Sequence, residues 1–217
     1  MVRRTKDEAQ ATRSHILDTA ELVFEQRGVS GTSLHEIAKA AGLTRGAIYW
    51  HFKDKAELFD AMMQRVVLPA EDMLERAGGT GEPDPLELLR RATVEVLLRT
   101  ASDKRVQRVF EIAYHKCEYV GDATGVRDRH IASQNECLKT IEAGFRACIR
   151  AGRLPATVKP RIAAIGAMCL VSGLIASWVL DPRSFSLRLH AESLVDFYFR
   201  GLAAPPPARA RRARARR

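Results

Sequence analysis

The stretch Ser33-Leu-His-Glu-Ile-Ala-Lys-Ala-Ala-Gly-Leu-Thr-Arg-Gly-Ala-Ile-Tyr-Trp-His-Phe52 decides the fold of the first part of this chain. Ser33 and Glu36 have the spacing of a capping box, so a helix is expected to begin directly after Ser33. Gly42 is expected to end that helix, because glycine tolerates the left-handed conformation that closes a helix. Thr44 can cap a second, short helix from Arg45 to about Phe52. Residues 34–52 are therefore predicted to form a helix-turn-helix.

The outer face of the second helix carries side chains suited to DNA. Arg45 can make two parallel hydrogen bonds to a guanine edge in the major groove. Thr44 and the N–H groups at the helix start suit a phosphate. Tyr49, Trp50 and His51 offer donors for phosphates and flat surface for sugars or a thymine methyl. The alternative is a packed surface in a small helical bundle, but two exposed aromatic side chains on a short helix are costly without a partner.

The rest of the chain also has helical periodicity, and no period-two strand pattern stands out. The predicted fold class is all-α, with about nine helices: an N-terminal three-helix helix-turn-helix DNA-binding domain, followed by a C-terminal helical domain. The first helix carries the apolar stripe Ile16, Leu17, Ala20, Val23 and Phe24. The later helices are expected after Asp54 to about Ala77, after Asp84, and over about 104–119, 124–151, 162–180 and 184–202.

Composition excludes a disordered or low-complexity chain, because 46% of the 217 residues are hydrophobic and 28% are charged. The net charge is +9, but six of the positive charges are arginines in residues 209–217, so a polyanion site must be a local patch. We interpret residues 205–217 as a disordered, solvated Arg-rich tail. The alternative is that this tail adds non-specific, salt-dependent affinity for DNA.

The sequence lacks the motifs that are typical of several other classes of protein. The basic opening of the chain is followed by no apolar run, so no secretory signal is expected. The uncharged stretch 162–180 is long enough to span a membrane, but its many small residues also suit a buried helix at a soluble subunit interface. No nucleotide or hydrolase motif is present, which predicts that the protein is not an enzyme.

Metal and redox chemistry are also not expected. His115, Cys117 and His130 have no ligand partners at an accepted spacing, so no metal and no cofactor is predicted. The cysteines at 117, 137, 148 and 169 form no Cys-x-x-Cys pair. We interpret them as reduced core thiols, with a redox sensor as the alternative.

Two segments carry a family resemblance. Residues 44–59, Thr44-Arg-Gly-Ala-Ile-Tyr-Trp-His-Phe-Lys-Asp-Lys-Ala-Glu-Leu-Phe59, resemble the DNA-binding signature of TetR-family repressors. The opening, Met1-Val-Arg-Arg-Thr-Lys-Asp-Glu-Ala-Gln-Ala-Thr-Arg13, resembles the branch that represses multidrug efflux pumps (AcrR-like), as do Tyr114-His-Lys-Cys-Glu118 and residues 172–178. The resemblance implies that the DNA contacts are Thr32 or Ser33, Thr44, Arg45, Gly46, Ala47, Tyr49, Trp50, His51 and Lys55.

The resemblance also implies a homodimer that binds a palindromic double-stranded operator, with the last two helices as the dimer interface. The expected domains are 1–53 for DNA binding and 54–204 for ligand binding and dimerisation. A small hydrophobic inducer would need an internal cavity with apolar walls. Its predicted lining, in which any single residue can equally be ordinary core, is Val66, Val96, Phe110, Tyr114, Cys137, Met168, Val171 and Ser172.

The predicted function is that of a cytoplasmic, ligand-responsive transcriptional repressor with no membrane partner. It is expected to control a multidrug efflux operon and to be released from DNA by hydrophobic drug-like inducers. Two alternatives stay open at this point. One is a regulator of the same build that responds to a metabolite or lipid, and the other is a helical, membrane-anchored adaptor.

Overall fold

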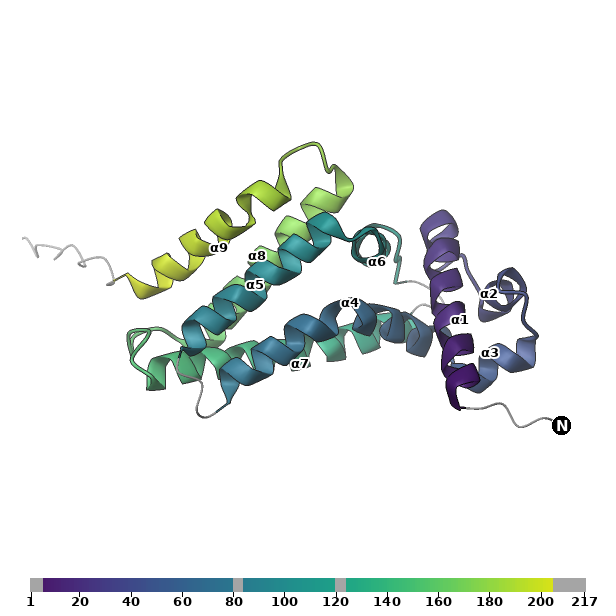
Figure 1. Ribbon diagram of the computed structural model, residues 1–217, viewed down its shortest axis with the longest axis horizontal. Coiled ribbons are helices and arrows are strands. Elements are labelled where there is room, and N and C mark those ends of the chain that lie inside the picture. Colours follow the sequence, from purple (N-terminus) through teal and green to yellow (C-terminus); the bar gives the residue numbers. More distant parts are fainter. Residues whose placement is uncertain (1–5, 80–83, 120–123, 205–217) are drawn as a thin grey trace, which may run out of the picture.

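The computed structural model describes residues 6–79, 84–119 and 124–204, and in this part of the chain the regular elements are helices, with no strand. A bundle of α1, α2 and α3 lies at one end, and α4 and α7 run side by side from it into a larger bundle completed by α5, α6, α8 and α9 (Figure 1). The all-α prediction is confirmed. The helices are α1 Lys6–Arg27, α2 Leu34–Ala40, α3 Arg45–His51, α4 Lys55–Gly78, α5 Pro85–Ser102, α6 Lys104–His115, α7 Thr124–Arg150, α8 Pro160–Leu180 and α9 Leu187–Ala203.

The predicted caps place the start of each helix in the helix-turn-helix. Ser33 and Glu36 form the complete capping box, with the Ser33 N–H donating to Glu36 Oε2 at 2.8 Å. Thr44 Oγ1 accepts from the N–H of Ala47 at 3.2 Å and so caps α3. Side-chain caps of this kind satisfy N–H groups that have no partner inside the helix. These local interactions fix where α2 and α3 begin.

The turn between α2 and α3 is closed by Gly42, whose φ of +68° lies in the left-handed region. The Leu43 N–H donates to Ala38 O at 2.8 Å and the Gly42 N–H donates to Lys39 O at 3.1 Å. This pair of bonds is the Schellman motif, which favours glycine because a Cβ is strained at positive φ. The turn therefore sets the angle at which α3 leaves α2.

Two predicted helix ends differ from those observed. The helix expected over 104–119 ends at His115, because the Lys116 carbonyl is turned to accept from the Val29 N–H at 2.9 Å. The helix expected from Ser184 begins at Leu187 instead. Ser186 Oγ caps it by accepting from Leu189 N, whereas Ser184 Oγ donates to Asp181 O at 2.6 Å in the preceding turn. Tertiary and turn contacts therefore decided these ends.

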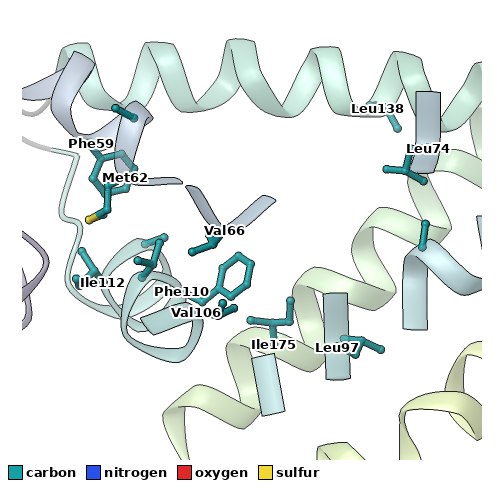
Figure 2. Packing of buried hydrophobic residues seen from close by; sticks show 14 of the residues in the cluster. Phe59, Met62, Val66, Leu74, Leu97, Val106, Phe110, Ile112, Leu138 and Ile175 are labelled. Carbon is teal, nitrogen blue, oxygen red and sulfur yellow. The ribbon is translucent and has the colours of Figure 1, made fainter. Parts of the chain in front are cut away.

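The buried apolar side chains form one continuous cluster through both bundles. In the N-terminal bundle, Phe24, Ile48 and Phe52 are fully buried, so α3 is held to α1 and α2 by its inner face. Figure 2 shows labelled members of the cluster from the larger bundle, among them Met62 of α4, Leu97 of α5, Phe110 of α6, Leu138 of α7 and Ile175 of α8. Because the cluster is continuous, α4 and α6 link the two bundles mechanically.

Helix α8 is the one helix of the described residues that is long and apolar enough to cross a membrane by length and composition. It packs against α5, α6, α7 and α9. Its contact with α9 is close at Gly166, where a Cβ would lie 2.5 Å from Tyr198 Oη. Its outward side, however, leaves Ile162 and Leu180 exposed.

Candidate functional site

The short helix α3 presents a polar and aromatic face to solvent. Tyr49 is 46% exposed and Trp50 is 72% exposed, whereas Ile48 between α3 and the core is fully buried. The guanidinium carbon of Arg45 lies 5.6 Å from the centre of the Tyr49 ring. This cation–π contact orients Arg45 along the outer face of the helix, where a base edge in the major groove could be reached.

The other predicted DNA contacts on α3 share this face. Gly46 is exposed, and a Cβ built there would have Thr44 Oγ1, at 4.0 Å, as its nearest neighbour. Ala47 and His51 are half-buried, and the His51 ring packs edge-on against Trp50 with centroids 4.6 Å apart. The small side chains at the middle of the face leave room for close approach of DNA.

Thr32 and Lys55, two residues of the predicted DNA-binding set, are turned into the protein instead. Thr32 is 2% exposed, and its hydroxyl donates to Gly28 O at 2.8 Å. Lys55 is 7% exposed, and its ammonium donates to Val29 O at 2.8 Å and to Thr32 O at 2.9 Å. A charged group must be hydrogen-bonded when it is buried, and these carbonyls supply that need. The structure therefore assigns Lys55 to the joint between α4 and the α1–α2 turn rather than to the surface.

The Lys55 joint gives a stability prediction. Lys55→Met should destabilise the folded chain by about 1–3 kcal/mol, because the carbonyls of Val29 and Thr32 lose a charged donor while they stay buried. Urea unfolding followed by circular dichroism measures the loss. Lys53→Met is the control, since Lys53 is exposed in the turn that precedes α4. Equal unfolding free energies for the two variants would contradict the assignment.

A cavity of about 180 Å³ lies inside the larger bundle, between α4, α5, α6, α7, α8 and α9. Apolar side chains dominate its wall. Seven of the predicted lining residues are on this wall: Val96, Phe110, Tyr114, Cys137, Met168, Val171 and Ser172. Val66 is not on it, because its side chain is 3% exposed and packs into the core, while Met63 and Val67 on either side face the cavity.

Tyr114 and Ser172 meet across the cavity wall, from α6 and α8. Burial raises the pKa of the Tyr114 phenol, and a hydrogen bond to Ser172 opposes this rise. The Tyr114 ring also stacks on Phe110 with centroids 6.1 Å apart. This pair therefore places polar groups in an otherwise apolar wall, and the two hydroxyl groups are hydrogen-bonded to each other.

A polar group of lining residues was missed by sequence reasoning. It consists of Asp60, Gln64, Arg129, His130, Ser133 and Gln134. In the sequence these residues form pairs that are four positions apart on two helices. Such spacing is also typical of a helix face exposed to water, so it does not indicate a cavity. Only the packing of α4 against α7 shows that these side chains line the cavity. Among the described residues, no three His, Cys, Asp or Glu side chains gather as a metal site would require.

Comparisons with known proteins agree with this arrangement. Residues 16–62 match the model of bacterial regulatory proteins of the tetR family, and residues 84–203 match the C-terminal region of MAATS-type transcriptional repressors. The chain is 44% identical over 198 residues to the HTH-type transcriptional regulator AcrR of Shigella flexneri, covering 90% of this chain and 91% of that protein.

Solved structures show the same fold along most of the chain. NalD, the secondary repressor of the MexAB-OprM multidrug efflux pump in Pseudomonas aeruginosa, aligns with a TM-score of 0.80 at 36% identity, covering 93% of this chain and 100% of that one. The complex of SmeT with triclosan aligns with a TM-score of 0.81 at 28% identity, covering 91% and 99%. SmeT is the repressor of the SmeDEF multidrug efflux pump of Stenotrophomonas maltophilia. With a helix-turn-helix that exposes its second helix and with both family models matched in order, the chain belongs to the TetR family of bacterial regulatory proteins, as an AcrR-like transcriptional repressor.

Proposed function

We propose that this repressor binds a palindromic operator as a dimer, controls a multidrug efflux operon, and leaves the DNA when a hydrophobic inducer fills the cavity. The observation that carries the proposal is the joint presence of an exposed Arg45–Tyr49–Trp50 face and a largely apolar cavity in one chain. NalD and SmeT, which repress efflux pumps, share the fold, and SmeT forms a complex with triclosan. DNA binding places the site of action in the cytoplasm.

The proposed dimer interface is the outward side of α8 and α9. Large apolar side chains are exposed there at Ile162, Leu180, Leu189 and Phe197, with exposed fractions of 63%, 70%, 72% and 72%. Several large exposed apolar side chains on two neighbouring helices are typical of an interaction site on a protein in water. A second copy of the chain would cover it with the same residues, as a two-fold symmetric interface requires. This accounts for the apolar α8 without a membrane.

The proposed mechanism is a shift between two spacings of the recognition helices. Dimers of this kind read half-sites about one DNA turn apart, roughly 34–36 Å. Helix α4 begins at Lys55, which holds the helix-turn-helix, and continues to Met63 and Val67 on the cavity wall. A ligand that prefers a different tilt of α4 therefore lowers operator affinity.

The proposal is tested with DNA from upstream of the protein's own gene and of any neighbouring pump operon. Fluorescence anisotropy should show tighter binding to that DNA than to random sequence, and drug-like hydrophobic compounds should reverse it. Release by acyl compounds instead of drugs would favour a metabolite or lipid regulator. Equal, weak affinity for all sequences at low salt would overturn the repressor assignment.

Base reading by Arg45 gives a specific prediction. Arg45→Ala should weaken operator binding by about 1–3 kcal/mol and leave random-DNA binding nearly unchanged, because a bidentate contact to a base is lost. Arg91→Ala removes an exposed arginine from α5, outside the α3 face, and is the matched control. Operator and random DNA are titrated side by side with both variants. Equal losses on the two DNAs for Arg45→Ala would show that Arg45 contacts only phosphate.

A further inference from the structure

The cavity has two chemically different ends. Its apolar end is built by side chains of α5, α8 and the second half of α7, among them Leu89, Phe145 and Ile175. The hydroxyl of Thr93, which also lines the cavity, donates to Leu89 O at 2.8 Å, and the Tyr114 hydroxyl is bonded to Ser172. These hydroxyl groups are therefore hydrogen-bonded within the protein, and the space favours an apolar body.

The polar end is built by the N-terminal halves of α4 and α7. Gln64 Nε2 donates to Asp60 Oδ2 at 3.1 Å on α4, and Gln134 Nε2 lies 2.9 Å from His130 Nε2 on α7. The His130 ring stacks on Tyr119 with centroids 6.2 Å apart and meets the edge of Phe59 at 6.5 Å. These contacts hold the polar groups in place beside aromatic rings, so this end is organised before any ligand enters.

The charged side chains at the polar end differ in their exposure to water and in their partners. Asp60 is half-buried, its hydrogen-bond partner Gln64 is a neutral amide, and no cation pairs with it among the described residues. Burial lowers the pKa of His130 and the Asp60 charge opposes this shift. Arg129 is exposed, where water screens its charge. Because Asp60 is less exposed than Arg129, water screens its charge less, and Asp60 attracts a cation in the cavity more strongly than Arg129 repels it.

We propose that Asp60 selects the inducer, and that the inducer is an amphipathic molecule with an apolar ring body in the apolar end and an amine cation beside Asp60. This inference rests on the proposed function, in which the cavity is the inducer site. Asp60 lies on the second turn of α4, close to Lys55, which ties that helix to the α1–α2 turn. The charged group of the inducer would therefore act on the part of α4 nearest the DNA-binding bundle.

The test uses three probes with one ring body and different end groups: 1-naphthylmethylamine, 1-naphthalenemethanol and 1-naphthaleneacetic acid. Their affinities for the full-length protein are measured by isothermal titration calorimetry. The cationic amine should bind tighter than the neutral alcohol, and the anionic acid should bind weakest. Asp60→Asn should weaken the amine by about tenfold and change the alcohol less than about twofold.

Asp72→Asn is the control, because Asp72 is exposed on the same helix outside the cavity wall. It should leave all three affinities unchanged. If the alcohol binds and the amine binds no better, or if Asp60→Asn weakens both equally, the inference is overturned while the cavity remains an inducer site. If none of the three probes binds, both the inference and the assignment of the cavity are overturned.

Discussion

Phe197→Arg should convert the protein into a monomer and weaken operator binding by about a hundredfold or more, because two linked half-site contacts become one. Phe197 is 72% exposed on α9, so its own chain does not need it for folding. In a two-fold symmetric interface the introduced arginine would replace an apolar contact with the partner and would have to lose its bound water there. The monomer is therefore expected to be folded but unable to hold an operator.

Sedimentation velocity measures the subunit number, and anisotropy with the operator measures the affinity of the same sample. Ile131→Arg is the matched control, since Ile131 is also an exposed apolar residue but lies on α7. That variant should remain a dimer with unchanged operator affinity. A Phe197→Arg dimer with normal affinity would place the interface away from α9. A far-UV circular dichroism spectrum equal to that of the unmodified protein excludes misfolding as the cause of monomer formation.

The local parts of this architecture follow directly from the sequence. The capping box at Ser33, the Thr44 cap and the Asp84 cap before Pro85 all join residues within three positions of each other. These caps depend only on residues that are close in the sequence, and so does the need for glycine at position 42. They could therefore be predicted from the sequence. For the same reason the exposed face of α3 could be predicted: the buried positions Ile48 and Phe52 leave only one direction for the remaining side chains.

Contacts between distant residues could not be predicted in this way. The ammonium of Lys55 is bonded to carbonyls 26 and 23 positions earlier in the chain, so its burial depends on how α4 packs against the α1–α2 turn. The polar end of the cavity depends likewise on α4 lying against α7. Val66 and Val67 show what helical periodicity cannot predict: Val66 packs in the core, whereas Val67, the next residue, lines the cavity. The spacing of apolar residues predicts which face of a helix points inward, but it does not predict which residues on that face line a cavity.

A charged cluster joins the DNA-binding bundle to the ligand-binding bundle, and Glu21 of α1 is at its centre. The Glu21 side chain is 1% exposed. Its carboxylate lies 3.3 Å from Arg65 Nη1 of α4, 3.3 Å from Arg105 Nε and 3.9 Å from Arg108 Nη1 of α6. Burial raises the pKa of Glu21 and the arginines oppose this rise. Asp18 also pairs with Arg65 and Arg105, and Glu25 pairs with Arg108, so Glu21 is the buried member of a larger charge network.

Glu21→Ala should lower the unfolding free energy by about 2–3 kcal/mol, because it removes the buried carboxylate of the network and its charged contacts, while Asp18 and Glu25 still pair with the arginines. Glu25→Ala is the control. Glu25 is 35% exposed and meets Arg108 Nε at 3.0 Å, so its loss should cost less than about 1 kcal/mol. Urea unfolding of both variants measures the difference, and hydrogen exchange of α1 amides shows where it acts. If the cluster couples the two bundles, Glu21→Ala should speed hydrogen exchange in α1 more than in α5. An equal increase in both helices would mean that Glu21 stabilises the chain without linking the two bundles.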